Sequence, residues 1–344
     1  MTEFDGDQGV SRRKVLECMT WVGTGVLWSI SGGVPFSLGI IGEAVAKQSA
    51  GLTFLQISDS HIGFNKPVNP DVAGTLQQTI DLIQILPVKP SFMIHTGDIS
   101  HLSKPEEFDD ADKIISQAHL DVHYVPGEHD LLDAEVKLYH QRYGRDAKGT
   151  GWYSFDANGV HFVGLVNVLD ASGHGNMGTS LGNLGREQLE WLKADLEDRS
   201  ASTPIVVFAH VPLWMVYPKW GWGTEDAAQA LQYLKRFGSV TVLNGHVHQV
   251  MQKVEGNVTF HTALSTSIPL PAPGAAASPA PIPVPAEKLR SMLGIANVTF
   301  SQNHERLAII DSPLQPPVTT APEDQPARPV PLHSAKMRKR KKHK

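Results

Sequence analysis

A chain of 344 residues with 41% hydrophobic and 19% charged residues can bury one large core or two small ones, which excludes a wholly disordered protein. The formal net charge is -5, but residues 336–344 hold seven of the 30 Lys and Arg, which leaves 23 basic against 35 acidic residues elsewhere. A basic body built to bind nucleic acid is therefore excluded, and we expect no sequence-specific nucleic-acid partner. The sequence does not indicate an oligomeric state.

The N-terminal segment has the pattern of an export signal. Arg12 and Arg13 precede an uncharged, Gly- and Ser-rich stretch over 18–42, and the small-x-small run Ala-Val-Ala follows at 44–46. The segment resembles a twin-arginine signal, so we expect residues 1–46 to be removed and the protein to be exported, periplasmic or extracellular. A retained membrane anchor is the alternative, because the uncharged stretch could span about 30 Å of hydrocarbon. Cys18, the only cysteine, would leave with the signal, and with it any thiolate or disulfide.

Short apolar runs alternate with amphipathic stretches from residue 51 to residue 264. The apolar runs predict strands at 53–58, 91–96, 121–126, 204–209 and 239–244. The amphipathic stretches predict helices at 72–86, 105–118 and 186–199. Runs 152–156 and 160–166, joined by Asn158 and Gly159, predict an antiparallel hairpin. We expect an α/β fold in which two sheets form a β-sandwich flanked by helices.

The last third of the chain is rich in proline. Residues 268–287 contain seven prolines and predict a Pro/Ala-rich linker or loop that is extended and poorly packed. Residues 288–311 contain two runs, 296–300 and 306–311, that predict closing strands of the same domain. Residues 312–344 predict a Pro-rich and basic disordered tail. Its basic end, 336–344, is interpreted as a solvated end, with an anionic surface as the alternative partner.

Each of the five single strands is followed by side chains that can bind metal ions. In chain order these are Asp59, His61, Asp98, Glu128, His129, Asp130, His210, His246 and His248. The carboxyl ends of strands in an α/β sheet converge on one crevice, so residues far apart in sequence meet there. A single Asp-x-His or Gly-Asp is also explained by an ordinary turn, but five such strand ends favour a metal site.

The residue types indicate which ions suit this site. Nitrogen and oxygen ligands without sulfur suit Zn, Mn or Fe. More than four ligands indicate two divalent or trivalent metal ions that share one carboxylate.

The series Asp59-Ser60-His61, Gly97-Asp98, Gly127-Glu128-His129-Asp130, His210 and Gly245-His246-Val247-His248 resembles the calcineurin-like metallophosphoesterases. The resemblance implies their four-layer fold for a domain over 47–267 with the strands up to 311. It implies that Asp59, His61 and His248 hold one ion. It also implies that Glu128, His210 and His246 hold the other ion and that Asp98 bridges the two. By the same resemblance, His129 lies unligated near the leaving group, and Asp130 orients it.

Glu128 departs from the family pattern, which has Asn at this position. A carboxylate can still bind the second ion, but it adds negative charge where an anionic phosphate must dock. The substitution favours a harder ion such as Mn or Fe, or it distorts the site enough to lose one ion. The sequence leaves these two consequences open.

We expect an exported phosphohydrolase with two metal ions. It would hydrolyse a phosphomonoester or phosphodiester by attack of a metal-bound hydroxide, with His129 protonating the leaving alkoxide. A hydrogen bond to a metal ligand is the alternative role of His129. Two rival hypotheses remain: a metal-binding module that lost turnover because Glu128 repels phosphate, and a membrane-tethered binding module that acts through the tail.

Other polar and aromatic residues lie close to these motifs. His95, His101 and His261 are interpreted as hydrogen-bonded structural residues and are left out of the site. An aromatic group follows His210, and it predicts either a lip that stacks a base or lipid, or ordinary core packing. The group comprises Trp214, Tyr217, Trp220 and Trp222.

Overall fold

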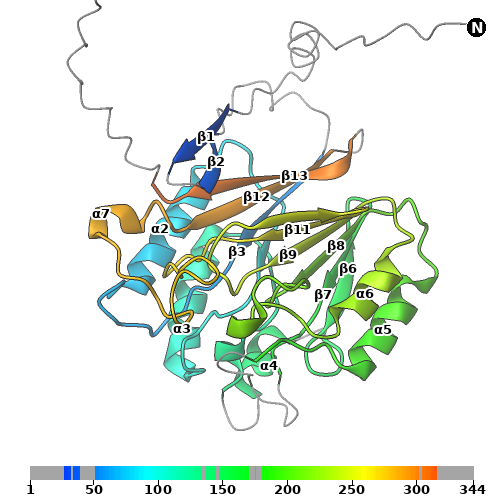
Figure 1. The fold of residues 1–344 in the computed structure, drawn as a ribbon, viewed down its shortest axis with the longest axis horizontal. Coiled ribbons are helices and arrows are strands. Elements are labelled where there is room, and N and C mark those ends of the chain that lie inside the picture. The colour runs from blue at the N-terminus through cyan, green and yellow to red at the C-terminus, as the bar shows by residue number, and fades with distance from the viewer. Residues whose placement is uncertain are drawn as a thin grey trace, which may run out of the picture.

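The computed structural model describes residues 27–31, 34–38, 51–132, 137–144, 147–169, 175, 180–301 and 304–315. Two large β-sheets lie face to face, and helices cover their outer faces (Figure 1). The predicted α/β sandwich flanked by helices is confirmed. Strands β1 (Leu27–Ser31) and β2 (Val34–Leu38) pair antiparallel as a separate two-stranded sheet.

The first large sheet has five strands in the order β13-β12-β3-β4-β5. These are β3 (Leu52–Ile57), β4 (Met93–His95), β5 (Val122–Tyr124), β12 (Gly294–Ser301) and β13 (His304–Pro313). Strands β3, β4 and β5 are parallel, whereas β12 is antiparallel to β3. The first large sheet thus combines β3, near residue 51, with β12 and β13, which lie near residue 315.

The second large sheet has six strands in the order β10-β11-β9-β8-β7-β6. These are β6 (Tyr153–Ala157), β7 (Val160–Gly164), β8 (Ile205–Ala209), β9 (Val240–Asn244), β10 (Gln252–Glu255) and β11 (Val258–Thr262). Strands β7, β8, β9 and β11 are parallel. The predicted hairpin of β6 and β7 is confirmed, and its turn residues Asn158 and Gly159 both have positive φ, as a tight hairpin turn needs.

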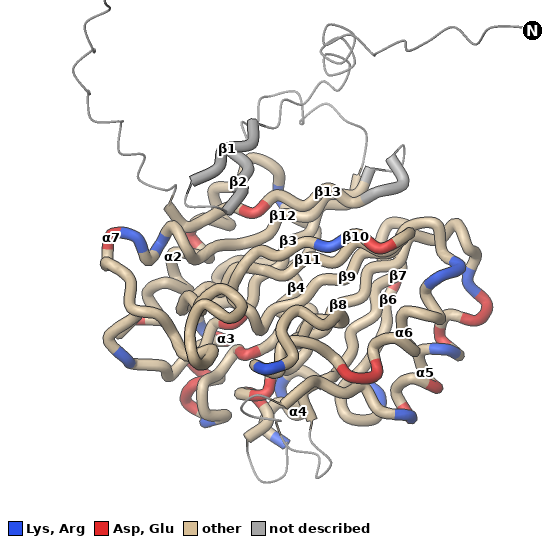
Figure 2. Tube along the Cα trace, viewed as in Figure 1, with Lys and Arg blue, Asp and Glu red and all other residues tan. Residues whose placement is uncertain are grey.

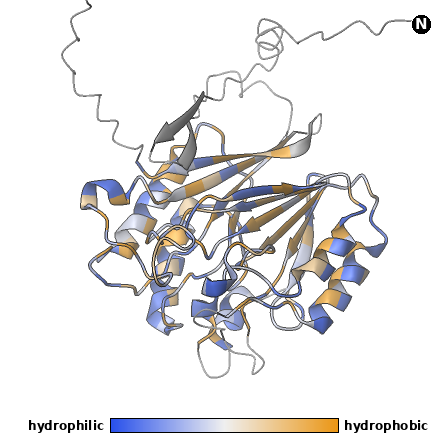
Figure 3. Ribbon diagram, viewed as in Figure 1, coloured by the Kyte–Doolittle hydropathy of each residue, from blue (hydrophilic) through white to orange (hydrophobic). Residues whose placement is uncertain are grey.

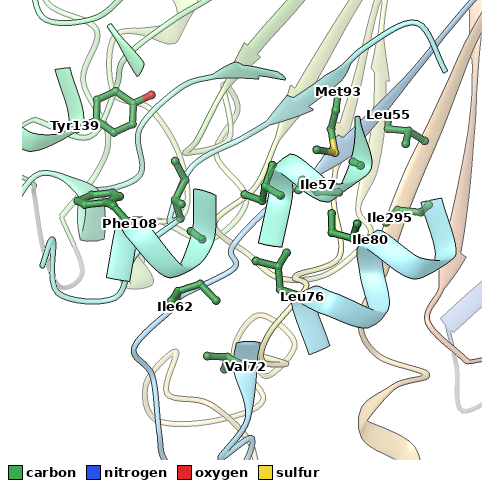
Figure 4. Packing of buried hydrophobic residues seen from close by; sticks show 14 of the residues in the cluster. Leu55, Ile57, Ile62, Val72, Leu76, Ile80, Met93, Phe108, Tyr139 and Ile295 are labelled. Atoms are coloured by element: carbon green, nitrogen blue, oxygen red, sulfur yellow. The ribbon is translucent and has the colours of Figure 1, made fainter. Parts of the chain in front are cut away.

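Apolar side chains fill three layers around the two sheets. Neighbouring residues of β3 point to opposite faces, so Phe54 packs between the sheets while Leu55 packs beneath helices. Helices α2 (Val72–Gln84) and α3 (Pro105–Ile115) cover the first sheet, and Figure 4 shows Leu76 and Ile80 of α2 in this layer. Helices α5 (Arg186–Glu197) and α6 (Ala227–Leu234) cover the second sheet.

The surface properties of the helices agree with these layers. The helices carry hydrophilic and hydrophobic positions on different faces (Figure 3), and charged residues lie mostly on helices and loops (Figure 2). Each Leu or Ile side chain that such a face buries contributes about 1.5–3 kcal/mol of transfer free energy. The periodicity read from the sequence therefore corresponds to real buried faces.

Several elements were not predicted from the sequence. Among them are β1, β2, β10, β11, α4 (Lys137–Tyr143), α6 and α7 (Ala286–Leu289). Strand β10 is exposed at every residue, so it has no hydrophobic pattern to detect. The prediction of poor packing over 268–287 is wrong for its first four residues, Ile268 to Pro271, which are buried.

Both ends of the chain fall largely outside the described residues. The predicted signal, 1–46, is described only in the backbone of β1 and β2, and the basic end, 336–344, is not described at all. Within the described ranges, no helix is both long and apolar enough to cross a membrane.

Candidate metal centre

The predicted ligands lie in loops that follow the carboxyl ends of five strands. Asp59 and His61 follow β3, Asp98 follows β4, and His210 follows β8. Glu128 begins the short 3-10 helix η3 (Glu128–Asp130) after β5, while His246 and His248 follow β9. All seven side chains meet, because the carboxyl ends of the parallel strands from both sheets open at the same edge.

The first group of converging side chains consists of Asp59, His61 and His248, and all three are buried. His248 Nε2 lies 3.2 Å from Asp59 Oδ1. The same nitrogen lies 3.3 Å from His61 Nε2. We call these three residues the first cluster.

The second group consists of Glu128, His210 and His246. The two oxygens of Glu128 lie 3.1 Å from His210 Nε2 and 3.1 Å from His246 Nδ1. His246 Nδ1 also lies 3.2 Å from His210 Nε2. Although Glu128 Oε2 is this close to His210, its geometry there is not that of a hydrogen bond, and the buried oxygen has no hydrogen-bond partner. We call these three residues the second cluster.

Asp98 lies between the two clusters. Its Oδ2 atom is 3.4 Å from His61 Nε2 in the first cluster and 3.4 Å from His210 Nε2 in the second. Its Oδ1 atom accepts a hydrogen bond from the His129 N–H at 3.0 Å. One carboxylate therefore faces both clusters with a single oxygen.

Backbone carbonyls fix the orientation of two of the imidazoles. His210 Nδ1 donates to Thr96 O at 2.6 Å, and His248 Nδ1 donates to Ile268 O at 2.6 Å. With the proton on Nδ1, the Nε2 atom of each neutral ring carries a lone pair that points into its cluster. Ligating histidines have this arrangement, in which the outer nitrogen donates to a carbonyl or carboxylate.

The donor set fits cations. Neighbouring donors about 2.1 Å from an ion are about 3.0–3.4 Å apart, and the donor pairs within each cluster are 3.1 to 3.3 Å apart. Facing lone pairs repel one another unless a proton or a cation lies between them. Nitrogen and carboxylate oxygen donors without sulfur suit Zn, Mn or Fe, as the sequence indicates.

Five of the seven candidate ligands have left-handed backbone. The φ angles are 55° at Asp59, 42° at His61, 55° at Asp98, 68° at His246 and 52° at His248. Such angles are uncommon outside glycine, and Asp and His adopt them more readily than most residues. The described chain has eight non-glycine residues of this kind, so the strain gathers at these loops, as it does at functional sites.

Two glycines let the loops approach one another. A Cβ atom on Gly97, where φ is +94°, would lie 2.5 Å from Gly127 N and 2.6 Å from His210 Nδ1. A Cβ atom on Gly127 would lie 2.0 Å from Asp98 Oδ1. Both positions therefore need glycine for close packing, and Gly97 needs it for its backbone as well.

The charges of the clusters shift several pKa values. Burial alone would raise the pKa of Glu128, but His246 and His210 lower it well below its usual range. Burial alone would lower the pKa of His210, but Asp98 and Glu128 raise it well above its usual value. For His61 burial prevails, and the pKa is lowered well below its usual value. The pKa values of Asp59 and Asp98 are lowered as well, so the site stabilises the ionised form of all three carboxylates.

His129 lies beside the clusters, as the sequence predicts, but Asp130 does not orient it. His129 Nδ1 donates to His101 O at 2.7 Å. The Asp130 carboxylate instead accepts hydrogen bonds from the backbone N–H groups of Ile99, Ser100 and Gly127 at 2.8 to 3.1 Å. The predicted catalytic role of Asp130 is therefore corrected: it joins the loops after β4 and β5. Burial and the charge of Asp98 raise the pKa of Asp130 to about 7.

His101 belongs to the site, although the sequence interpretation left it out. Its ring stacks on that of His129 with centroids 4.8 Å apart, and its Nδ1 lies 3.4 Å from His61 Nδ1. Five residues, Thr96 to Ser100, separate it from His95, which is buried and lies within hydrogen-bond distance of Ser60 Oγ at 2.9 Å. His261 bonds to Asp311 at 3.0 Å. His95 and His261 are therefore hydrogen-bonded structural residues, as interpreted from the sequence, whereas His101 is not.

The aromatic group after His210 mostly packs inward. Trp220 and Trp222 are buried with Val247 and Leu270, and Trp214 packs against Phe260. These contacts favour the core interpretation over the stacking lip. Val247 lies between His246 and His248, so the aromatic packing supports the loop that carries both ligands.

Comparisons with known proteins agree with this geometry. The profile of the calcineurin-like phosphoesterases matches residues 52–250. Purple acid phosphatase 15 of Arabidopsis thaliana is 33% identical over 138 residues, which cover 36% of this chain and only 24% of that protein. A 3',5'-cyclic-nucleotide phosphodiesterase of Nostoc sp. is 22% identical over 223 residues, which cover 62% of this chain and 78% of the relative.

The fold also matches solved structures. The crystal structure of a dimetal phosphatase from Danio rerio superimposes with a TM-score of 0.60 at 15% identity and covers 77% of this chain and 97% of that chain. At this identity the likeness concerns the fold alone. The profile match covers more than half of the chain, and the chain therefore belongs to the calcineurin-like phosphoesterase family.

Proposed function

We propose that this protein is a binuclear, metal-dependent phosphoric ester hydrolase. The observation that carries the proposal is the position of Asp98 Oδ2, 3.4 Å from His61 Nε2 and 3.4 Å from His210 Nε2. One oxygen that faces both clusters is what two neighbouring cations with a shared ligand require. The first cluster would hold one cation, the second cluster the other, and Asp98 both.

When bound, two cations supply Lewis-acid chemistry, since they lower the pKa of a water molecule toward neutrality and offset negative charge on the phosphoryl oxygens. His129 supplies the proton for the leaving group. Its Nδ1 is bonded to the His101 carbonyl, which leaves Nε2 as the atom that hands over a proton. A positioned acid of this kind contributes about 10²–10⁴ in rate.

The charge of the site supports a phosphodiester as the preferred substrate. Asp59, Asp98 and Glu128 place three carboxylates among seven ligands. A phosphodiester carries one negative charge and a phosphomonoester carries two near neutral pH, so the third carboxylate disfavours the monoester more. The Nostoc relative, which this chain covers over 78% of its length, is a 3',5'-cyclic-nucleotide phosphodiesterase.

The negative charge of Glu128 also supports a second candidate function, a metal-binding module with little turnover. The protein stripped of metal and reloaded with Mn, Fe or Zn separates the two. We expect two bound ions per chain by mass spectrometry and faster hydrolysis of bis-p-nitrophenyl phosphate than of p-nitrophenyl phosphate. Two bound ions without hydrolysis of either ester would support the binding module instead.

We further propose that the protein is exported through its paired arginines, Arg12 and Arg13. The support is the sequence pattern over 11–46, in which the pair precedes an uncharged stretch and a small-x-small cleavage site. A retained anchor is the alternative. Export would place the site where metal ions and phosphoesters outside the cytoplasm reach it.

A further inference from the structure

Three polar atoms of the loop between β4 and α3 form hydrogen bonds with His129: the carbonyl oxygen of His101 and the hydroxyl oxygens of Ser100 and Ser103. The ring Nδ1 donates to His101 O at 2.7 Å. The carbonyl oxygen of His129 accepts from Ser103 Oγ at 2.8 Å and from Ser100 Oγ at 3.3 Å. The direction of the His129 ring therefore depends on where residues 100–103 place the carbonyl of His101.

Glu107 holds this loop from the opposite side. It lies in the first turn of α3 and is buried, with 5% of its surface exposed. Its Oε2 atom accepts from the N–H of Leu102 at 2.6 Å and from the N–H of His101 at 3.1 Å. A buried carboxylate with two backbone donors forms stronger hydrogen bonds than a neutral acceptor would.

The two interactions meet on one peptide group. The carbonyl that accepts the hydrogen bond from His129 Nδ1 and the N–H that donates to Glu107 belong to the same peptide unit, between His101 and Leu102. Because a trans peptide is planar, its C=O and N–H point in opposite directions and cannot turn independently. Glu107 therefore fixes the direction of the carbonyl and, through it, the direction of the His129 ring.

Gly63 makes room for this arrangement. A Cβ atom at Gly63 would lie 2.3 Å from Glu107 Oε1, and φ at Gly63 is +104°. The backbone after His61 thus packs directly on the carboxylate. Glu107 Oε2 also accepts from the Lys104 N–H at 3.5 Å, which caps the start of α3, but this contact is longer than the two that it makes with the loop. The adjacent Glu106 lies in the same turn and is exposed.

We propose that Glu107 is a positioning residue for His129, acting through the His101–Leu102 peptide group and not through the metal ligands. The inference rests on the proposed function, because it assigns proton donation to His129. It predicts that loss of Glu107 harms the reaction most where the leaving group needs a proton.

Two diesters that differ only in the leaving group test this proposal. In methyl p-nitrophenyl phosphate the leaving p-nitrophenolate departs without a proton, whereas in methyl phenyl phosphate the more basic phenolate needs one. Glu107→Met keeps the side-chain volume and removes the acceptor. We expect kcat for the phenyl ester to fall at least about tenfold and kcat for the p-nitrophenyl ester to fall less than about threefold, at equal metal content.

Three further variants complete the design. Glu106→Met is the matched control in the same turn and is expected to change neither rate. Glu107→Gln keeps an acceptor oxygen and is expected to restore most of the rate on the phenyl ester. If Glu107→Met does not fold, Glu107→Asp replaces it, because the shorter side chain withdraws the carboxylate from the Leu102 N–H.

Equal losses on the two esters, or no loss in a folded Glu107→Met, would overturn the positioning role. The same selective loss in Glu106→Met would assign the effect to helix charge and overturn it as well. Hydrolysis of neither ester by the parent protein at full metal loading would instead reject the proposed function. The two failures are thereby distinguished.

Discussion

At the residue scale, Glu128 is the candidate ligand whose replacement would have two opposing effects on turnover. It touches both imidazoles of the second cluster at 3.1 Å. Removing its charge would help an anionic ester to dock by on the order of 1–4 kcal/mol. Loosening the second ion would remove several kcal/mol of transition-state stabilisation.

We expect the metal contribution to prevail when metal is limiting. Glu128→Gln and Glu128→Asn should therefore have a lower kcat/KM on bis-p-nitrophenyl phosphate than the parent, by about tenfold or more. The measurement is kcat/KM over a range of Mn concentrations. A faster Glu128→Asn at every concentration would show that the carboxylate inhibits the site.

The convergence of the seven candidate ligands could be predicted from sequence, because each is a side chain at a strand end. The roles of His101 and Asp130 could not. His101 orients His129 through its main-chain carbonyl, and Asp130 binds three backbone N–H groups. Contacts made by backbone atoms leave no mark in residue type, so only the fold reveals them.

At the element scale, the loop after β4 depends on the absence of a side chain at Gly97. Gly97→Ala should lower the free energy of unfolding by about 2–5 kcal/mol, since it adds a clash with Gly127 and His210 to the cost of positive φ. Gly159→Ala is the matched control, because φ is +80° there and nothing lies within 4 Å of the added Cβ atom.

Urea unfolding of both variants measures the difference. Gly159→Ala should cost about 1–2 kcal/mol, the backbone cost alone. Equal destabilisation by the two substitutions would show that the loops after β4 and β5 relax around the added methyl group.

Helix α5 is joined to β7 by a partly buried polar contact outside the site. His161 Nε2 lies 2.7 Å from Asp195 Oδ2, and Ser154 Oγ donates to Asp195 Oδ1 at 2.6 Å. Burial alone would raise the pKa of Asp195, but the hydrogen bonds of His161 and Ser154 lower it. Because the folded-state pKa is the lower one, this carboxylate stabilises the fold above its unfolded pKa of about 3.9.

Asp195→Asn should therefore lower the free energy of unfolding at pH 7 by about 1.5–3 kcal/mol. The difference from the parent should shrink as the pH falls below about 4 and through the folded-state pKa, where the parent loses the same charge. Urea unfolding at pH 7 and pH 3.5 measures this, with Asp198→Asn at the exposed end of α5 as control. A difference independent of pH would contradict the ionic contribution.

The same elements show what periodicity can predict. The strands β3, β8 and β9 are buried at every residue, so their apolar runs stand out in the sequence. Strand β10 is wholly exposed and was missed, although it pairs with β11. A strand held mainly by backbone hydrogen bonds at a sheet edge has no apolar pattern of its own.

At the scale of the whole molecule, the order of strands could not be read from the sequence. Strand β12 pairs with β3, so residues separated by more than two hundred positions are neighbours. Hydrophobic runs indicate that a segment is a strand, but they do not identify its partner. The candidate ligands that follow five of the strands indicate that the carboxyl ends of these strands lie close together.

The proposed export also concerns the whole molecule. Replacement of both Arg12 and Arg13 by Lys should leave the protein in the cytoplasm, because a twin-arginine route reads the pair and not merely its charge. Fractionation of cells that produce the parent and the variant measures this. Unchanged export would indicate a general secretory signal or an anchor, and an intact N-terminus on the exported protein would favour the anchor.

In the proposed site, two metal ions share Asp98. Metal content per chain, measured by mass spectrometry on the parent, Asp98→Asn and Asp59→Asn after reloading with Mn, tests it most directly. We predict two ions in the parent and a larger loss in Asp98→Asn than in Asp59→Asn, because Asp98 Oδ2 faces both clusters while Asp59 belongs to the first. We also predict a fall in kcat/KM of about a thousandfold or more, or ~4 kcal/mol, for both variants. Two ions and full activity in Asp98→Asn would rule out a shared Asp98.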